Sequence, residues 1–245
     1  NFLGLTDNQR YLYLKSFNLD GTEAWSLVGG NTTNCYSERI TADENNIYVV
    51  GDCSGSSFSW RRPLSVSVSP QTVADTYPLL VSAISHAGDP SWTHLINNPG
   101  GAQKACNGVA VGCDGVYITG QTYNGSTFPG GVQKTVSGAT DYFFLASLDR
   151  VAGTTQWVRT AKSSSTYGMD GYDLTVGPNQ QVMVTGFMAD NVTFEGGLTS
   201  NGSSDDDLFV ARYSPDGHLV WCHRAVDNQD ENAKAIAAYG NGRYV

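Results

Sequence analysis

Cysteine is the residue type of this chain best suited to covalent chemistry, and five are present. Cys35 and Cys53 fall on segments that we expect to be neighbouring strands of one sheet. Cys106 and Cys113 are seven residues apart and flank a turn-like segment. Because disulfides are typical of secreted chains, we predict these two pairs and leave Cys222 for a cysteine outside the sequence. The alternative is buried free thiols, which pack as small apolar side chains, and the absence of a Cys-x-x-Cys spacing argues against zinc.

Sequons of the form Asn-x-Ser/Thr provide candidate glycosylation sites at Asn31, Asn124, Asn191 and Asn201. Asn124 and Asn191 precede equivalent phenylalanines by four and three residues, which places them at nearly the same point of a repeat described below. A eukaryotic secretory pathway would modify such sites, whereas a bacterial source would usually leave them bare. The sequence therefore supplies candidates and leaves their occupancy open.

Metal binding and catalysis have weaker support in the sequence than disulfides and glycosylation. His94 and His223 each follow a repeated tryptophan by two residues, but the matching positions hold Leu27 and Arg159, so the repeat requires no imidazole there. The acidic run 205–207 could offer oxygen ligands to Ca²⁺, yet the spaced Asp/Gly loop of a calcium site is absent, and we expect turn capping and solubility instead. No nucleophile elbow, phosphate loop or metal-binding histidine pair occurs. We predict a protein that has no cofactor and is not an enzyme.

Charge and hydropathy argue against two classes of partner. The net charge is −9, from 14 basic and 23 acidic residues, and Arg61-Arg62 is the longest basic run. Nucleic acid and an anionic membrane surface would repel such a chain. No stretch has the roughly 18 apolar residues that a membrane span needs. Residues 1–4 do not resemble a signal peptide, so we expect the leader of an exported protein to lie outside this sequence.

These residues sit within a repeat of roughly 66 residues. The first landmark is a tryptophan, at spacings of 67, 65 and 64 residues: Trp25, Trp92, Trp157 and Trp221. The second is a glycine that ends an apolar segment, at spacings of 69 and 66: Gly51, Gly120 and Gly186. The third is a phenylalanine seven or eight residues after that glycine: Phe58, Phe128 and Phe194. Three landmarks in one order indicate about four units, and we expect the tryptophans to carry the core.

One unit read in full predicts four short antiparallel strands. Residues 208–213 are rich in strand formers, 214–217 form a Pro/Gly turn, and 218–223 return. Residues 235–239 begin a third strand that turns into 243–245. We predict one all-β domain, a β-propeller whose blades are four-stranded antiparallel meanders. Its boundaries follow the repeat: a single domain 1–245, with units 11–79, 80–143, 144–207, and 208–245 together with 1–10.

The connections and the ends refine this prediction. The longest link carries Pro63 to Pro70, which we expect to form an additional edge strand. A helical solenoid is disfavoured, because no window shows sustained helical periodicity. Val245 falls where Val184 does, and 1–2 fall where 193–194 do, so both ends cut the repeat within a unit. We expect a window from a longer array, with a closed four-bladed ring as the alternative.

The repeated residues resemble a known family, the seven-bladed-propeller repeats of secreted bacterial proteins. The pattern is carried by Val184-Thr185-Gly186, 193–200, 207–213, Gly217 and Trp221, and again by 122–146. The resemblance covers nearly the whole chain, although the first unit departs from it over 59–78. It implies a propeller in an extracellular or cell-surface setting. It implies no reaction, because a shared fold does not supply a function.

These features predict a secreted or cell-surface module that acts by presenting surfaces, in adhesion or in extracellular assembly. Its partners would be other proteins, copies of itself or glycans, and incomplete units would suit strand exchange between neighbouring copies. A carbohydrate-binding propeller is one alternative, with Trp60, Tyr123 and Tyr167 stacking on sugar rings. The scaffold part of an extracellular enzyme, whose catalytic residues lie elsewhere, is another.

Overall fold

The computed structural model describes residues 9–30, 34–62, 71–73, 76–100, 102–164, 168–202, 205–225, 229–239 and 242–245. Within these ranges the protein is all-β, and every strand pair is antiparallel. This confirms the predicted all-β class with antiparallel strands. The described residues contain no helix long and apolar enough to cross a membrane. The predicted edge strand at Pro63 to Pro70 lies outside the described residues.

Four sheets contain most of the strands. Sheet 1 has the order β1 (Leu12–Phe17), β2 (Glu23–Gly30), β5 (Ser57–Arg61), β6 (Gln71–Thr72). Sheet 2 has the order β3 (Cys35–Ala42), β4 (Asn46–Cys53), β7 (Leu79–Ser85), β8 (Pro90–Ile96). Sheet 3 has the order β9 (Cys106–Val111), β10 (Val116–Tyr123), β13 (Asp141–Leu148), β14 (Thr155–Ser163), extended by β17 (Val192–Phe194) and β18 (Thr199–Ser200). Sheet 4 has the order β15 (Met169–Val176), β16 (Val182–Ala189), β19 (Asp206–Tyr213), β20 (Leu219–Arg224).

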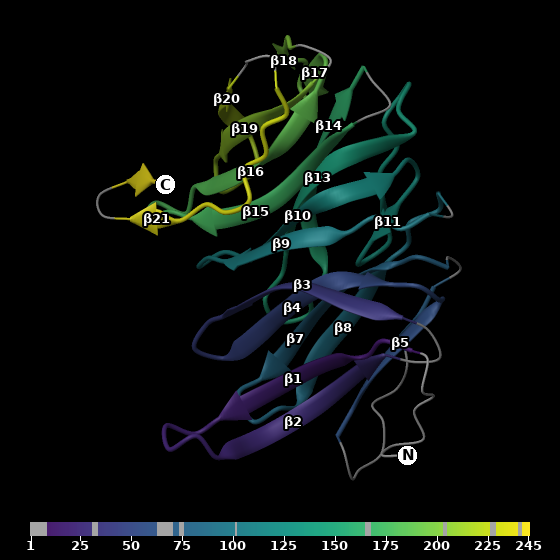
Figure 1. Ribbon diagram of the computed structural model, residues 1–245, viewed down its shortest axis with the longest axis vertical. Helices are drawn as coiled ribbons and strands as arrows, with labels where there is room; N and C mark the ends of the chain where they lie inside the picture. Colours follow the sequence, from purple (N-terminus) through teal and green to yellow (C-terminus); the bar gives the residue numbers. More distant parts are fainter. Residues whose placement is uncertain are drawn as a thin grey trace.

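Two further hairpins form small sheets of their own: β11 (Thr127–Phe128) with β12 (Val132–Gln133), and β21 (Ala238–Tyr239) with β22 (Arg243–Tyr244). The four larger sheets follow one another along the long axis of the molecule, from the N-terminal end to the C-terminal end (Figure 1). The hydrogen-bonded sheets are out of phase with the repeat units read from the sequence. Strands β19 and β20 complete a sheet with β15 and β16, which precede them, and β21 and β22 do not join them.

Three hairpins pair with strands that lie earlier in the chain than their own neighbours. The β5–β6 hairpin lies between β4 and β7 in the chain but pairs with β2. Likewise, β17–β18 lies between β16 and β19 but pairs with β14. The β11–β12 hairpin is bridged through Thr127 to Asn97, directly after β8. These hairpins occupy the outer edges of β2 and β14, so the next strand in the chain begins a new sheet.

Apolar clusters fill the space between successive sheets. Strand β7 shows why: its side chains alternate between the two faces, and nearly all are buried because both faces are covered. Leu80 and Ile84 pack toward Leu27 and Trp60 of sheet 1. Val81, on the opposite face, packs with residues of sheet 3. A third cluster joins sheets 3 and 4.

The repeated glycine of the inner strands has a steric cause. A Cβ on Gly51, Gly120 or Gly186 would overlap a backbone carbonyl oxygen of the adjacent strand, that of Tyr36, Ala105 and Asp170 respectively. The register of each of these strand pairs shifts at the same point. Only glycine allows the backbones to approach so closely, which explains the second landmark of the repeat.

Candidate functional site

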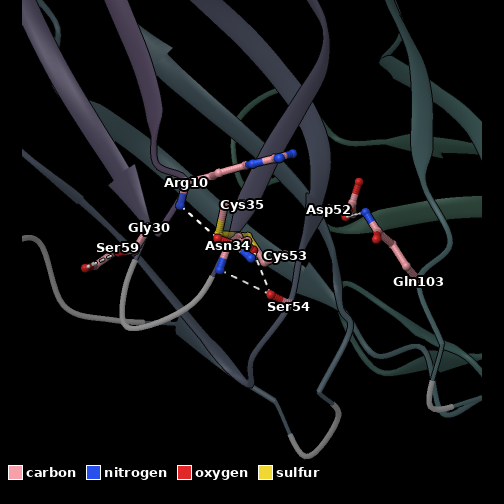
Figure 2. Close-up of a disulfide and its surroundings, with 9 residues drawn as sticks. All are labelled: Arg10, Gly30, Asn34, Cys35, Asp52, Cys53, Ser54, Ser59 and Gln103. Atoms are coloured by element: carbon pink, nitrogen blue, oxygen red, sulfur yellow. Dashed lines mark hydrogen bonds between the residues drawn. A yellow bond between two sulfur atoms is a disulfide. The ribbon is translucent and has the colours of Figure 1, made fainter. Parts of the chain in front are cut away.

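The disulfide joins the first two strands of sheet 2 (Figure 2). Cys35 of β3 and Cys53 of β4 are directly opposite in the register, and their Cα atoms are 4.1 Å apart. The segment before β1 is tied to the same corner, since the Arg10 amide donates to Asn34 Oδ1 at 2.8 Å. The predicted Cys35–Cys53 pair is therefore confirmed, and it lies where sheet 1 meets sheet 2.

The second predicted disulfide is not formed. Cys106 begins β9 and is buried, whereas Cys113 follows the other end of β9 and is exposed; both are free. A strand rises about 3.3 Å per residue, so the two cysteines are separated by roughly 20 Å, too far for a disulfide. Burial raises the pKa of the Cys106 thiol well above its usual range and that of Cys222 to about 12. Both thiols are thereby held in the unreactive protonated form.

Two buried carboxyl groups lie near Cys106. Burial raises the pKa of Asp52 to about 6, although Gln103 Nε2 donates to its Oδ2 at 2.6 Å. Burial also raises the pKa of Asp170 to about 7, although Asn107 Nδ2 donates to its Oδ1 at 3.0 Å. Such values suit acid–base chemistry. Each carboxyl is engaged by an amide from sheet 3 or its approach, so both also link inner strands of different sheets.

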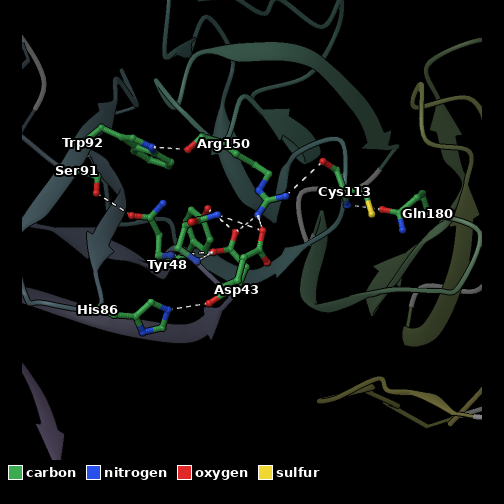
Figure 3. A network of polar contacts seen from close by, with 11 residues as sticks. Asp43, Tyr48, His86, Ser91, Trp92, Cys113, Arg150 and Gln180 are labelled. Atoms are coloured by element: carbon green, nitrogen blue, oxygen red, sulfur yellow. Dashed lines mark hydrogen bonds and ion pairs between the residues drawn. The ribbon is translucent and has the colours of Figure 1, made fainter.

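A second polar network joins sheets 2 and 3 at the opposite ends of the strands (Figure 3). Arg150 Nη2 lies 2.6 Å from Asp43 Oδ2 and 2.8 Å from Glu44 Oε1. The hydroxyl of Tyr48 donates to the same Asp43 oxygen at 2.9 Å. Burial alone would raise the pKa of Asp43, but hydrogen bonds from the backbone of Asn46 and its neighbour outweigh burial and lower it. The network is a set of ion pairs and hydrogen bonds that joins two turns, and we call it the Asp43–Arg150 clamp. The sequence did not reveal it because its members are distant along the chain.

The structure argues against sugar stacking by Trp60. Trp60 is buried between sheets 1 and 2, and its indole Nε1 donates to Ser82 Oγ at 2.8 Å, so the ring cannot reach a ligand. Tyr123 is half-buried beneath the ammonium group of Lys104, 5.0 Å from the ring centroid. Tyr167 lies outside the described residues. The prediction for Trp60 is wrong because strand β5 turns this side chain into the interface between sheets.

The other candidate residues are placed as follows. Asn191 and Asn201 are exposed, whereas Asn124 is half-buried and its Oδ1 accepts a hydrogen bond from the Val136 amide at 2.7 Å. Asn31 lies outside the described residues. In the acidic run, Asp207 is buried and pairs with Arg224.

The described ranges contain no group of three His, Cys, Asp or Glu residues able to hold a metal ion. The Nε2 atom of His94 lies within hydrogen-bonding distance, 2.8 Å, of the carbonyl oxygen of Ala152. His223 stacks beside Trp221, with ring centroids 5.0 Å apart. The two histidines therefore lie on different sheets, each beside the tryptophan of its own strand.

The repeated tryptophans make the same contact at each sheet boundary. The indole Nε1 donates to a carbonyl oxygen in a turn of the next sheet, in the pairs Trp25–His86 (2.9 Å), Trp92–Arg150 (3.1 Å) and Trp157–Pro215 (3.2 Å). A glycine of that turn lies against the ring; a Cβ there would be 2.6–2.8 Å from ring atoms, at Gly88, Gly153 and Gly217. We call this arrangement the Trp–turn contact. Trp25, Trp92 and Trp157 thus lie at sheet boundaries, where Trp92 is buried and the other two are half-buried. Trp221 is also half-buried, but it meets no such turn among the described residues.

Sheets 1 and 2 expose three large apolar side chains near a groove. Tyr13 and Phe17 of β1 are 63% and 60% exposed, and Ile40 of β3 is 57% exposed. A groove of about 360 Å³ runs between β1 and β3, lined by Leu12, Leu14, Ile40 and Val49 among others. We call the surface formed by Tyr13, Phe17 and Ile40 the end face. It is the strongest candidate for a site of interaction, because large apolar patches on a folded protein mark contact surfaces.

No protein-family model matches this chain, and no curated protein matches it.

Proposed function

We propose that this chain is a non-catalytic structural and interaction module of an extracellular or cell-surface assembly. The observation that carries the proposal is the end face, where three large apolar side chains are more than half exposed near an apolar groove. A disulfide at the junction of sheets 1 and 2 supports an oxidising location. Adhesion and assembly both need a stable scaffold that holds such a surface in place.

A β-propeller of the resembled family is the arrangement that we propose for the sheets. Its support lies at the inner strands, where β9 contacts both β3 and β15. Arg39 of β3 reaches past β9 to Asp173 of β15, with a separation of 3.5 Å between Nε and Oδ1. Converging inner edges of this kind are expected when sheets are arranged as blades around an axis.

Catalysis has less support than interaction. The two carboxyl groups with raised pKa values are occupied by amide partners that hold neighbouring sheets together. Carbohydrate binding retains Tyr123 alone among the described candidates, and Lys104 already covers its ring. A scaffold role within an extracellular enzyme would still use the same interaction surface.

The proposal is tested on the protein in its native source. Intact cells are treated with a protease that cannot enter them, and the thiols of the chain are counted by alkylation and mass spectrometry. We expect protease to remove the chain from intact cells, and Cys35 and Cys53 to resist alkylation until they are reduced. Protection from the protease, together with a reduced Cys35–Cys53 pair, would contradict an extracellular role. A glycan array tests the carbohydrate alternative on the same material.

A further inference from the structure

A pocket of about 300 Å³ lies between sheets 3 and 4, where the β17–β18 hairpin faces the turn that leads into β20. Its floor is aromatic, because Phe194 of β17 and Tyr213 of β19 line it and both are buried. Polar side chains complete the lining: Arg159, Thr160, Glu195 and His218. An apolar floor with a few hydrogen-bonding groups is typical of small-molecule sites.

The equivalent place between sheets 2 and 3 is closed by direct packing. There the Thr155 amide donates to the Pro129 carbonyl oxygen at 3.1 Å, which ties the hairpin to the turn of the next sheet. A Cβ on Gly130 would lie 3.7 Å from Thr154. Gly196 is the counterpart of Gly130, since each follows the repeated glycine by ten residues, but a Cβ on Gly196 would meet nothing within 4 Å. The β17–β18 hairpin therefore stands away from the turn of sheet 4, and the pocket is the space between them.

The lining of the pocket contains one cationic and one anionic side chain. Arg159 donates from Nε to the Gly217 carbonyl oxygen at 2.8 Å, from Nη2 to that of Asp216 at 3.0 Å, and from Nη1 to that of the preceding residue at 3.3 Å. A guanidinium group has five N–H donors, so two remain beyond the three that meet described carbonyl oxygens. Glu195 accepts from Lys134 Nζ at 3.2 Å, and 40% of its side chain is exposed. The charges of Arg159 and Glu195 cancel, while both side chains keep hydrogen-bonding capacity for a ligand.

This lining favours a neutral ligand that carries several hydroxyl groups. An anionic ligand would lie beside the Glu195 carboxylate and a cationic ligand beside the Arg159 guanidinium, so either would meet a like charge. A sugar hydroxyl both donates and accepts, so one sugar ring can accept from Arg159 and donate to Glu195. The apolar C–H face of the ring suits the aromatic floor. Ligand pockets range from roughly 300 to 1,000 Å³, so this pocket suits a single ring.

We propose that the pocket between sheets 3 and 4 binds one neutral monosaccharide unit, either free or at the end of a glycan. Arg159 and Glu195 are its hydrogen-bonding partners. Neither Trp60 nor Tyr123, the described residues that the sequence suggested for sugar stacking, lines this pocket. The end face lies on sheets 1 and 2, so the inference goes beyond the proposed function, and its failure would leave that function standing.

Saturation-transfer NMR of the purified 245-residue chain with glucose, galactose, mannose and N-acetylglucosamine tests the inference, and a glycan array provides the same sugars at glycan ends. We expect at least one of these sugars to bind. Glu195→Gln should raise its dissociation constant at least about tenfold, because a hydrogen bond to a charged group is lost. The matched control is Glu23→Gln, since Glu23 also forms an exposed pair with a lysine, Lys15, but does not line the pocket. It should bind like wild type.

A second variant and two charged sugars sharpen the test. His218→Trp should abolish binding by filling the pocket, and because 76% of the His218 side chain is exposed, circular dichroism should show a folded protein. Glucuronate should bind more weakly than glucose, and glucosamine more weakly than N-acetylglucosamine. Binding on the array alone, lost in Glu195→Gln, would identify a glycan end as the ligand.

Three results would overturn the inference. The first is no binding of any of the four neutral sugars in solution or on the array. The second is binding that Glu195→Gln and His218→Trp leave as strong as in Glu23→Gln. The third is tighter binding of glucuronate or glucosamine than of the matching neutral sugar, which would contradict the charge argument.

Discussion

Replacing Trp157 by alanine tests how strongly neighbouring sheets are held together. The Trp157 ring packs on Gly217, its Nε1 donates to the Pro215 carbonyl oxygen at 3.2 Å, and the Arg159 guanidinium lies 5.4 Å from the ring centroid. A fully buried aromatic side chain costs about 3–5 kcal/mol when truncated to alanine. Trp157 is only half-buried, so we expect the free energy of unfolding to fall by about 2–3 kcal/mol, of which the hydrogen bond contributes about 1.

The assay is urea unfolding followed by far-UV circular dichroism, because tryptophan fluorescence changes with the substitution itself. Trp157→Phe keeps an aromatic ring but removes the N–H donor, and should cost about 1 kcal/mol. Trp221→Ala is the matched control, since Trp221 holds the same repeat position but meets none of the acceptor turns of the described chain. In a monomeric sample it should cost less than about 1 kcal/mol.

Two results would refute this reasoning. A loss below about 1 kcal/mol for Trp157→Ala would mean that the Trp–turn contact adds little to the interface between sheets 3 and 4. An equal loss for Trp157→Ala and Trp221→Ala would mean that the tryptophan stabilises its own strand and not the neighbouring turn.

Three further predictions follow from other parts of the structure. The double variant Cys35→Ser/Cys53→Ser should have a free energy of unfolding about 3 kcal/mol lower than wild type, because the disulfide closes a loop of 18 residues. Reducing agent should destabilise the wild-type protein but leave the double variant unchanged. Burial raises the pKa of Asp52 to about 6 and that of Asp170 to about 7, so the folded state binds protons more tightly than the unfolded state. The free energy of unfolding should therefore fall as the pH rises from about 4 through 7. A urea midpoint that rises over this pH range, or a pH dependence that Asp52→Asn and Asp170→Asn leave unaltered, would contradict this prediction. Gly120→Ala should lower the free energy of unfolding by more than about 2 kcal/mol, because its Cβ would overlap the Ala105 carbonyl oxygen. Thermal unfolding close to that of wild type would contradict this prediction and show that β9 can move away.

The sequence predicted local features well because they depend on neighbouring residues. Alternating and β-branched segments around Val184 and Phe209 identified strands, and the Pro/Gly turn before Gly217 identified a hairpin. The Cys35–Cys53 pair followed from two strands joined by a short connection. The tryptophan spacing indicated equivalent positions, which the structure places at successive sheet boundaries.

What the sequence did not reveal depends on pairing between distant segments. Nothing local indicates that β5 leaves its neighbours to join β2, and this crossing both buries Trp60 and sets the phase of the sheets. The Asp43–Arg150 clamp joins residues more than 100 positions apart. The buried Asp207–Arg224 pair looked like part of a solvated acidic run, because its partner arrives from the next strand.

Hydroxyl-radical footprinting read by mass spectrometry tests the central claim most directly, because it reports the solvent exposure of individual side chains. At low concentration, we expect Tyr13 and Phe17 to be oxidised readily, while their repeat counterparts Phe144 and Phe209 are protected. Protection of Tyr13 and Phe17 to the same degree as Phe144 and Phe209 would contradict an exposed end face.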